Sequence, residues 1–207
     1  MKDDQRYRPP KSGFSRREFL KGSGAAAAVT AIGQGAGTAI ADDAGMQIVG
    51  PGKLSITLNV NGKDRKAQAE PRTTLLEVLR IQFDLTGAKP ISEDGSSGGS
   101  TVLMDGKPVT AETVLALEAI GKRIETAESL GGDRLDAVPA AFVANDGQQC
   151  GFCTPGFVVA VRAFLKKHPD ATEDDIRAGL NGNVCRCGTY SNIIQAALEV
   201  VKGAPRG

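Results

Sequence analysis

Two stretches near the C-terminus, Gln149-Cys-Gly-Phe-Cys-Thr-Pro-Gly156 and Gly182-Asn-Val-Cys-Arg-Cys-Gly188, contain all four cysteines of this 207-residue chain. A single turn brings both sulfurs of a Cys-x-x-Cys pair to one side. An extended backbone does the same for Cys-x-Cys, because residues i and i+2 point to one face, so Arg186 must point away. Four thiolates complete the ligand set of one 2Fe–2S cluster or one zinc ion. His168 is the only histidine, so the chain offers no comparable second site for a soft metal.

The residues alone leave several interpretations of the cysteines open: an iron–sulfur cluster, a structural zinc ion, two disulfides, or buried inert thiols. A Cys-x-Cys disulfide closes a very small, strained ring, which argues against the third. Spacing does not separate zinc from iron–sulfur. Both pairs precede predicted helix starts, at Thr154 and Ser191, where free N–H groups and the helix dipole favour thiolates. Small residues there let backbone amides approach sulfur, namely Gly151, Gly182 and Gly188.

The overall composition excludes few classes of protein. The chain has 25 basic and 24 acidic residues, a net charge of +1, and 4% aromatic residues, which gives no indication of nucleic-acid binding. With 41% hydrophobic residues it can form one or two small domains with real cores.

The first 41 residues have the order of an export signal. Ser15-Arg-Arg-Glu-Phe-Leu-Lys21 is a twin-arginine motif, Ala25 to Ile32 is weakly apolar, and Ala39-Ile-Ala41 is a small-x-small cleavage site. We predict cleavage after Ala41, no membrane span in the mature chain, and a periplasmic location. Twin-arginine export carries folded proteins, so a cluster inserted before export would protect the thiols from the oxidising periplasm.

After a linker of residues 42–52, residues 53–126 have the pattern of a β-grasp, ferredoxin-like domain. Alternation predicts a strand at Leu54–Val60, and Asn61-Gly62 is typical of a type I′ hairpin turn. Pro71 to Arg80 has helical spacing, with Thr73 or Thr74 as its cap. The remaining predicted strands are 66–70, 101–104, 107–109 and 123–126.

After a second linker, residues 127–137, the pattern of residues 138–203 is helical. We predict a helix over 138–145 and a second helix that ends at about Lys167, with Thr154 as its N-cap and Pro155 at its first position. Thr172 to Asp175 resembles a capping box for a helix ending at Leu180, and Ser191 caps a last helix to Val201. The predicted fold class is therefore α+β, a β-grasp domain followed by a four-helix domain that carries the four cysteines; the resemblance described next implies that this second domain binds a 2Fe–2S cluster.

From Leu54 to about Val201 the chain resembles the iron–sulfur subunit of the molybdenum hydroxylases, the group of xanthine dehydrogenase, aldehyde oxidoreductase and carbon monoxide dehydrogenase. The resemblance rests on Pro71-Arg-Thr-Thr-Leu-Leu, Leu85-Thr-Gly-Ala-Lys89, Thr101-Val-Leu-Met-Asp-Gly106 and the two cysteine stretches. It implies a cluster next to the molybdopterin of a large partner subunit, with Gln149 near the pterin. The implied cluster ligands are Cys150, Cys153, Cys185 and Cys187.

The same resemblance implies that a second cluster site has been lost. The family's N-terminal domain carries a plant-type cluster held by three closely spaced cysteines and a distant one. Serine stands at all three spaced positions here, and the fourth falls at Glu112. Because a serine hydroxyl is neutral at pH 7 and iron prefers thiolate, we expect no cluster and a flexible Gly/Ser turn. The former ligand positions are Ser92, Ser97, Ser100 and Glu112; an alternative is a hard cation held by Ser92, Glu93, Asp94 and Glu112.

The function implied is electron transfer within a periplasmic molybdopterin-dependent oxidoreductase of the aldehyde or N-heterocycle hydroxylase type. One 2Fe–2S cluster would relay single electrons from molybdenum to a c-type cytochrome or another periplasmic acceptor, without a flavin partner that depends on an N-terminal cluster. No catalytic acid, base or nucleophile can be assigned from the sequence, and His168, which precedes Pro169 at a helix end, is expected at a solvated position. The alternative is a structural or assembly subunit whose cluster, or four-cysteine zinc site, only stabilises the fold.

Overall fold

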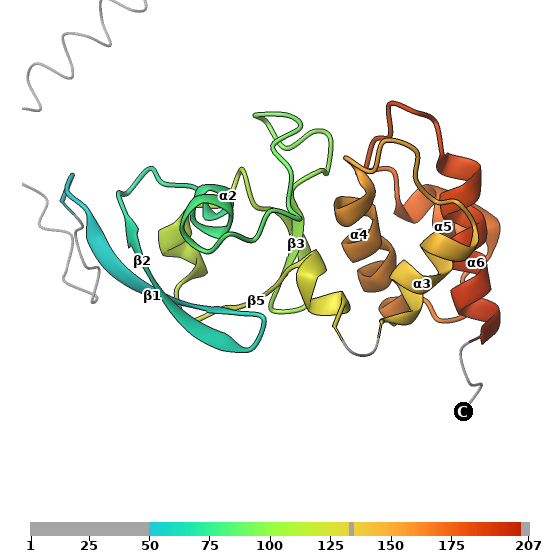
Figure 1. Ribbon diagram of the computed structural model, residues 1–207, viewed down its shortest axis with the longest axis horizontal. Helices are drawn as coiled ribbons and strands as arrows, with labels where there is room; N and C mark the ends of the chain where they lie inside the picture. Colours follow the sequence, from blue (N-terminus) through green and yellow to red (C-terminus); the bar gives the residue numbers. More distant parts are fainter. Residues whose placement is uncertain (1–49, 133–134, 204–207) are drawn as a thin grey trace, which may run out of the picture. The chain divides into compact units, whose positions relative to one another are not determined.

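The computed structural model describes residues 50–132 and 135–203 (Figure 1). The predicted signal peptide lies outside these residues. The described part combines one mixed sheet with helices, so the predicted α+β class is confirmed. The strands are β1 (Leu54–Val60), β2 (Lys63–Ala69), β3 (Thr101–Met104), β4 (Lys107–Thr110) and β5 (Arg123–Glu125).

The five strands form a sheet in the order β2-β1-β5-β3-β4. Strands β1 and β2 are an antiparallel hairpin that pairs Leu54 with Ala69 and Val60 with Lys63. Asn61 and Gly62 connect them with φ angles of +53° and +75°, as the predicted type I′ turn requires. Strand β5 runs parallel to β1 and antiparallel to β3, so it joins the two hairpins in one sheet.

Two predictions in this part of the chain had wrong boundaries. Strand β2 begins at Lys63 rather than at residue 66, because the two-residue turn pairs the chain immediately. The helix predicted from Pro71 is shorter: α2 (Leu75–Glu77) starts after its cap, Thr74, and passes into a π-helix, η1 (Val78–Gln82). The Thr73 N–H donates to the Glu70 carbonyl oxygen at 3.0 Å, so a turn occupies the first predicted residues.

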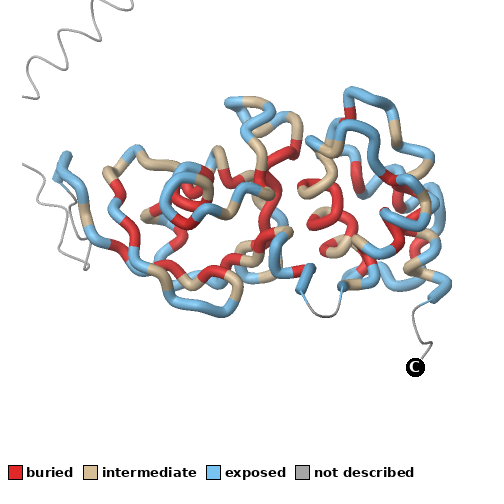
Figure 2. Tube along the Cα trace, viewed as in Figure 1, coloured by how far each residue is buried: buried red, intermediate tan, exposed pale blue. Residues whose placement is uncertain are grey.

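Buried residues occur in both the sheet part and the helical part (Figure 2), and the apolar ones form two clusters. The first lies between the sheet and α2, where alternate residues of β1 (Ile56, Leu58 and Val60) face α2 and η1. The second lies among the helices and includes Phe157, Ile176 and Ile193. Leu103 of β3 belongs to this second cluster, and β3 packs against α4, so the sheet and the helices are joined through apolar contact.

The helical part contains α3 (Ala137–Ala144), α4 (Thr154–Lys167), α5 (Glu173–Gly179) and α6 (Tyr190–Gly203). The predicted capping box of α5 is confirmed, since Thr172 and Asp175 bond to each other's backbone N–H. Two predicted caps are wrong: the N-cap of α4 is Cys153 rather than Thr154, and α6 begins at Tyr190, so Ser191 lies inside it. Short 3₁₀ turns occupy Ala116–Ala119 and Ala127–Leu130, the latter inside the predicted linker.

Candidate metal centre

The four cysteines lie in two loops that meet at one end of the helical part. Cys150 and Cys153 lie between α3 and α4, and Cys185 and Cys187 lie between α5 and α6. All four are free thiols, which contradicts the interpretation of two disulfides that the sequence had left open. Their side chains interact in two pairs across the loops, Cys150 with Cys187 and Cys153 with Cys185. The structure thus brings together all four predicted ligands, and each pair takes one cysteine from each loop.

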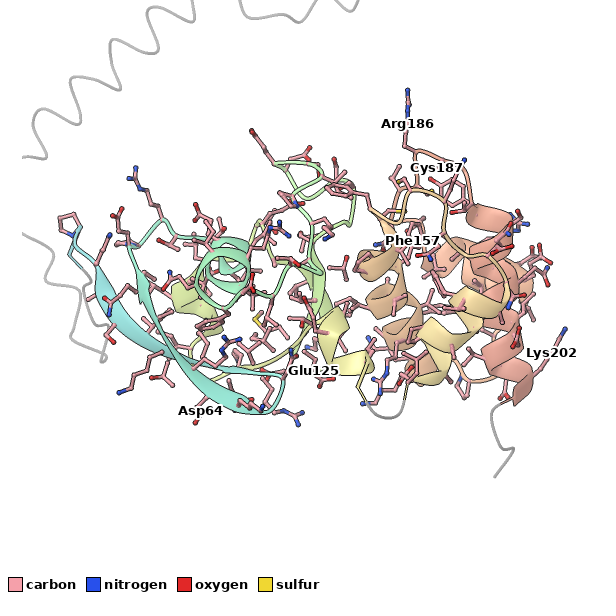
Figure 3. The ribbon with its side chains drawn as sticks, in the orientation of Figure 1. Asp64, Glu125, Phe157, Arg186, Cys187 and Lys202 are labelled. Atoms are coloured by element: carbon pink, nitrogen blue, oxygen red, sulfur yellow. The ribbon has the colours of Figure 1, made fainter. Side chains whose placement is uncertain are left out.

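The two pairs differ in exposure. Cys185 is buried and Cys153 is half-buried, whereas Cys150 and Cys187 are exposed. Figure 3 shows Cys187 at the outer edge of the helical part and Arg186 extending away from it, as predicted, but the predicted extended backbone is wrong, because the chain turns at Arg186 and Cys187. One side of the site is therefore closed by protein and the other is open.

Backbone N–H groups surround the sulfur atoms. The Phe152 N–H lowers the pKa of Cys150, with a smaller effect from the Cys187 side chain. The Cys150 N–H lowers the pKa of Cys187, but the Cys150 side chain and burial together raise it above its usual value. Such donors stabilise negative charge on sulfur, as thiolate ligands of a metal or cluster require.

The inner pair is polarised in the same way. Burial opposes ionisation of Cys185, yet the Thr189 hydroxyl and the backbone N–H groups of Thr189 and Gly188 outweigh it and lower the pKa of Cys185 to about 7. Burial and the neighbouring Cys185 raise the pKa of Cys153 to about 12. The Cys185 thiol of the inner pair therefore ionises readily, whereas the Cys153 thiol needs a bound cation to lose its proton.

Two residues at the site were missed by sequence reasoning. The Thr189 Oγ1 lies 3.3 Å from the Cys185 sulfur, and the Tyr190 hydroxyl accepts a hydrogen bond of 2.7 Å from the Cys185 N–H. The Tyr190 ring in turn packs edge-on against Phe157, with 6.1 Å between centroids. The only signal was that both residues directly follow the Cys-x-Cys-Gly segment.

The arrangement suits a two-iron cluster better than a single ion. A tetrahedral zinc site needs four ligands around one point. A 2Fe–2S cluster with four cysteine ligands instead takes two thiolates at each iron, which matches two separate pairs.

The other predicted site residues lie in different surroundings. Gln149 is exposed next to Cys150, at the open side of the site. His168 follows the last residue of α4 and is exposed, as expected for a helix end, and its ring packs on Phe164 with centroids 4.7 Å apart.

The former ligand positions of the N-terminal part do lie together. Ser92 Oγ is 2.8 Å from Ser97 Oγ and 3.3 Å from a carboxylate oxygen of Glu112, and Ser100 is fully buried. Burial raises the pKa of Glu112. Four oxygen side chains therefore occupy the positions that the resemblance assigns to thiolates.

Comparison with known proteins identifies the family. Residues 126–198 match the family model of a [2Fe-2S] binding domain. The chain is 36% identical to the aldehyde oxidoreductase iron-sulfur-binding subunit PaoA of Escherichia coli, over 96% of this chain and 92% of the relative. It is 37% identical to the nicotinate dehydrogenase small FeS subunit of Eubacterium barkeri, over 72% of this chain and 96% of that subunit.

A solved structure agrees with these relatives. The crystal structure of quinoline 2-oxidoreductase from Pseudomonas putida 86 contains a chain that matches with a TM-score of 0.71 and 39% identity, over 75% of this chain and 98% of that one. The chain belongs to the small iron–sulfur subunits of the molybdenum hydroxylases. This subunit carries a 2Fe–2S-binding domain, as its cysteine motifs indicated.

The subunit is exported to the periplasm by the twin-arginine pathway, because residues 13–33 match the model of that pathway's signal sequence. Among the described residues, none of the helices has the length and apolar character that crossing a membrane requires.

Proposed function

We propose that this chain is the electron-transfer subunit of a periplasmic molybdenum-dependent oxidoreductase that hydroxylates an aldehyde or an N-heterocycle. The observation that carries the proposal is the meeting of four free cysteines in two cross-loop pairs within the 2Fe–2S-binding domain. Relatives named as aldehyde oxidoreductase and nicotinate dehydrogenase subunits support the reaction class.

Cys150 and Cys187 would bind one iron, and Cys153 and Cys185 the other. A 2Fe–2S cluster supplies one-electron transfer when bound. The protein's part is to hold the inner pair within the helical core, to place N–H and hydroxyl donors at the sulfurs, and to leave the outer pair exposed. A partner's redox centre can therefore approach on the side of Cys150 and Cys187.

The partner that fits this open side is a large subunit that carries the molybdopterin. Gln149 is exposed at the same edge, beside Cys150, and its amide can both donate and accept a hydrogen bond. We assign Gln149 as a contact to the pterin. This chain supplies no acid or base for the hydroxylation, which belongs to the large subunit.

The N-terminal part, residues 53–126, is proposed to be a β-grasp domain without a cluster. Its mixed sheet with one helix supports the fold, and the oxygen side chains at Ser92, Ser97, Ser100 and Glu112 support the loss of the cluster. The helical 2Fe–2S domain would span residues 138–203, after a connection of residues 127–137. Mature chain would begin after Ala41, with residues 42–52 as a linker.

A single cluster has a consequence for the electron acceptor. Without a second relay in the N-terminal domain, the acceptor has to dock near the helical domain, and a c-type cytochrome or another periplasmic carrier meets this requirement. A flavin subunit that receives electrons through an N-terminal cluster is not expected.

Iron and sulfide analysis of the anaerobically purified complex tests the proposal. We expect two irons and two sulfides per chain and one 2Fe–2S signal from this subunit in the reduced complex. Four irons with two signals would contradict the single cluster, and a colourless chain with one zinc ion would contradict electron transfer.

A cysteine variant distinguishes an electron-transfer role of the cluster from a purely structural role. Cys150→Ser should abolish reduction of the acceptor while the complex still assembles, because Cys150 lies at the exposed edge of the site. Loss of assembly itself would instead indicate a subunit whose cluster only stabilises the fold.

A further inference from the structure

We propose that the loop of residues 92–100, here called the serine loop, is a brace that positions the segment of residues 182–188, here called the cysteine loop. On this view the residues that replaced the former cluster ligands position Cys185 for the remaining cluster. The inference rests on the proposed function, because it concerns how the cluster of the helical domain is held.

The serine loop is tied together by its own hydroxyl groups. Ser92 Oγ lies 2.8 Å from Ser97 Oγ, and it accepts a hydrogen bond of 3.0 Å from the Ser97 N–H. The Gly99 N–H donates to Ser97 Oγ at 3.3 Å. Side-chain oxygens therefore bind the loop's own backbone, in a segment whose composition predicted a flexible Gly/Ser turn.

Glu112 connects the hydrogen-bonded pair Ser92 and Ser97, here called the knot, to the sheet. One carboxylate oxygen lies 3.3 Å from Ser92 Oγ, and the Glu112 N–H donates to the buried Ser100 Oγ at 3.5 Å. The other carboxylate oxygen is buried without a hydrogen-bond partner, in keeping with the raised pKa of this group. Glu112 follows β4, so the knot is anchored on a regular element.

The serine loop also bonds directly to the cysteine loop. The Val184 N–H donates to the Ser97 carbonyl oxygen at 2.9 Å, and the Asn183 side-chain amide donates to the Gly98 carbonyl oxygen at 2.9 Å. Asn183 and Val184 immediately precede Cys185. Two successive residues before a proposed ligand are thus held by the carbonyl groups of two successive residues of the brace.

Close packing at Gly98 brings both cysteine-bearing segments to the same point. A Cβ on Gly98, whose φ is +66°, would lie 2.5 Å from the Gly182 carbonyl oxygen. A Cβ on Gly156, three residues after Cys153, would lie 2.4 Å from the Gly98 carbonyl oxygen. The start of α4 and the cysteine loop therefore both abut the brace, and a shift of Gly98 would move ligands from both cysteine-bearing segments.

Three serine-to-alanine variants of the full chain, purified as the complex, test this inference. Ser92→Ala and Ser97→Ala remove the knot, whereas Ser96→Ala is the matched control, because exposed Ser96 bonds only to Asp94. The readouts are the rate of iron loss to a chelator and the g-values of the reduced cluster. We expect iron loss to accelerate about fivefold for the first two variants, as one lost hydrogen bond implies, with shifted g-values, and the control to match the unmodified chain.

Two further variants keep the test decisive if Ser92→Ala does not fold. Asn183→Ala cuts a bond between the loops but leaves the knot intact, and it should reproduce the spectral shift. Ser92→Thr retains a hydroxyl and should restore the original spectrum. A chain without iron would refute the proposed function. Two irons per chain with identical spectra and iron release in Ser97→Ala, Asn183→Ala and Ser96→Ala would overturn only the brace.

Discussion

Among the four cysteines, Cys185 has its position and charge most closely determined by neighbouring groups, because three kinds of contact act on it. Its sulfur is buried, its N–H is held by the Tyr190 hydroxyl, and the Thr189 hydroxyl lies 3.3 Å from the sulfur. A metal-bound sulfur has no proton to give, so the Thr189 hydroxyl must then be the donor. A donor aimed at a cluster sulfur stabilises the more negative, reduced state.

Thr189→Val is therefore expected to lower the reduction potential of the cluster. A net hydrogen bond is worth about 0.5–1.5 kcal/mol, which corresponds to roughly 20–65 mV for a one-electron couple. A redox titration of the complex followed by electron paramagnetic resonance measures the shift, and Thr189→Ser should restore the original value. An unchanged potential in the valine variant would show that the hydroxyl does not bond to a cluster sulfur.

Among the secondary-structure elements, α5 bears on the site because it leads into the cysteine loop. Its first turn is held by the Thr172 and Asp175 capping box, with hydrogen bonds of 2.9 Å to the Thr172 N–H and 3.3 Å to the Asp175 N–H. Bonds from the Thr172 hydroxyl and then from its backbone N–H lower the pKa of Asp175. A carboxyl group whose native pKa lies below its unfolded value stabilises the fold above the unfolded pKa, and this stability is lost as the pH falls.

Asp175→Ala should therefore lower the Tm at neutral pH, and the difference from the unmodified chain should shrink as the pH falls below 3.8, the ordinary value for this group. Thermal unfolding of the full chain from neutral pH to below 3.8 follows the change. Asp174→Ala is the control, because Asp174 lies in the same turn without a capping bond. A difference in Tm that is constant with pH would mean that the ionised carboxylate is not the capping group.

The same scale shows what the sequence could predict and why. The hairpins and the α5 cap follow from local rules. A type I′ turn requires positive φ, which Asn61 and Gly62 adopt, and the Thr172 side chain bonds to the backbone three residues ahead. The start of α4 does not, because Cys153 already has helical angles of −82° and −15° and takes the cap position from Thr154. These angles belong to a loop whose Cys153 interacts with the distant cysteine loop, and residue type alone cannot reveal such a contact.

The cross-loop pairing was beyond sequence reasoning for a related reason. Spacing predicts which sulfurs share a loop, but the partner of each sulfur depends on how the two loops meet in the folded chain, where Phe157 of α4 contacts Tyr190 of α6. The positions of Ser92, Ser97 and Glu112 could be predicted by resemblance, yet their bonds to each other and the contact of the serine loop with Val184 depend on the folded chain.

For the whole molecule, the export signal and the cysteines impose one order of events. Free thiols that lie in interacting pairs would tend to form disulfides in an oxidising compartment, and the outer pair is exposed. A cluster that is bound before export occupies these thiols, and only a pathway that carries folded proteins preserves it. Export through the twin-arginine pathway, marked by Arg16 and Arg17, is therefore required by the chemistry of the thiols and also directs the protein to the periplasm.

Changing both arginines to lysine, Arg16→Lys with Arg17→Lys, should retain the chain in the cytoplasm with its iron content unchanged, because cluster insertion precedes transport. Iron analysis of fractionated cells measures this. The matched control replaces the signal with one for the Sec pathway, which carries unfolded chains; that chain should reach the periplasm without iron and with its cysteines oxidised. An iron-loaded chain from the Sec route, or an iron-free chain retained in the cytoplasm, would show that the order of insertion and export is not fixed by the thiols.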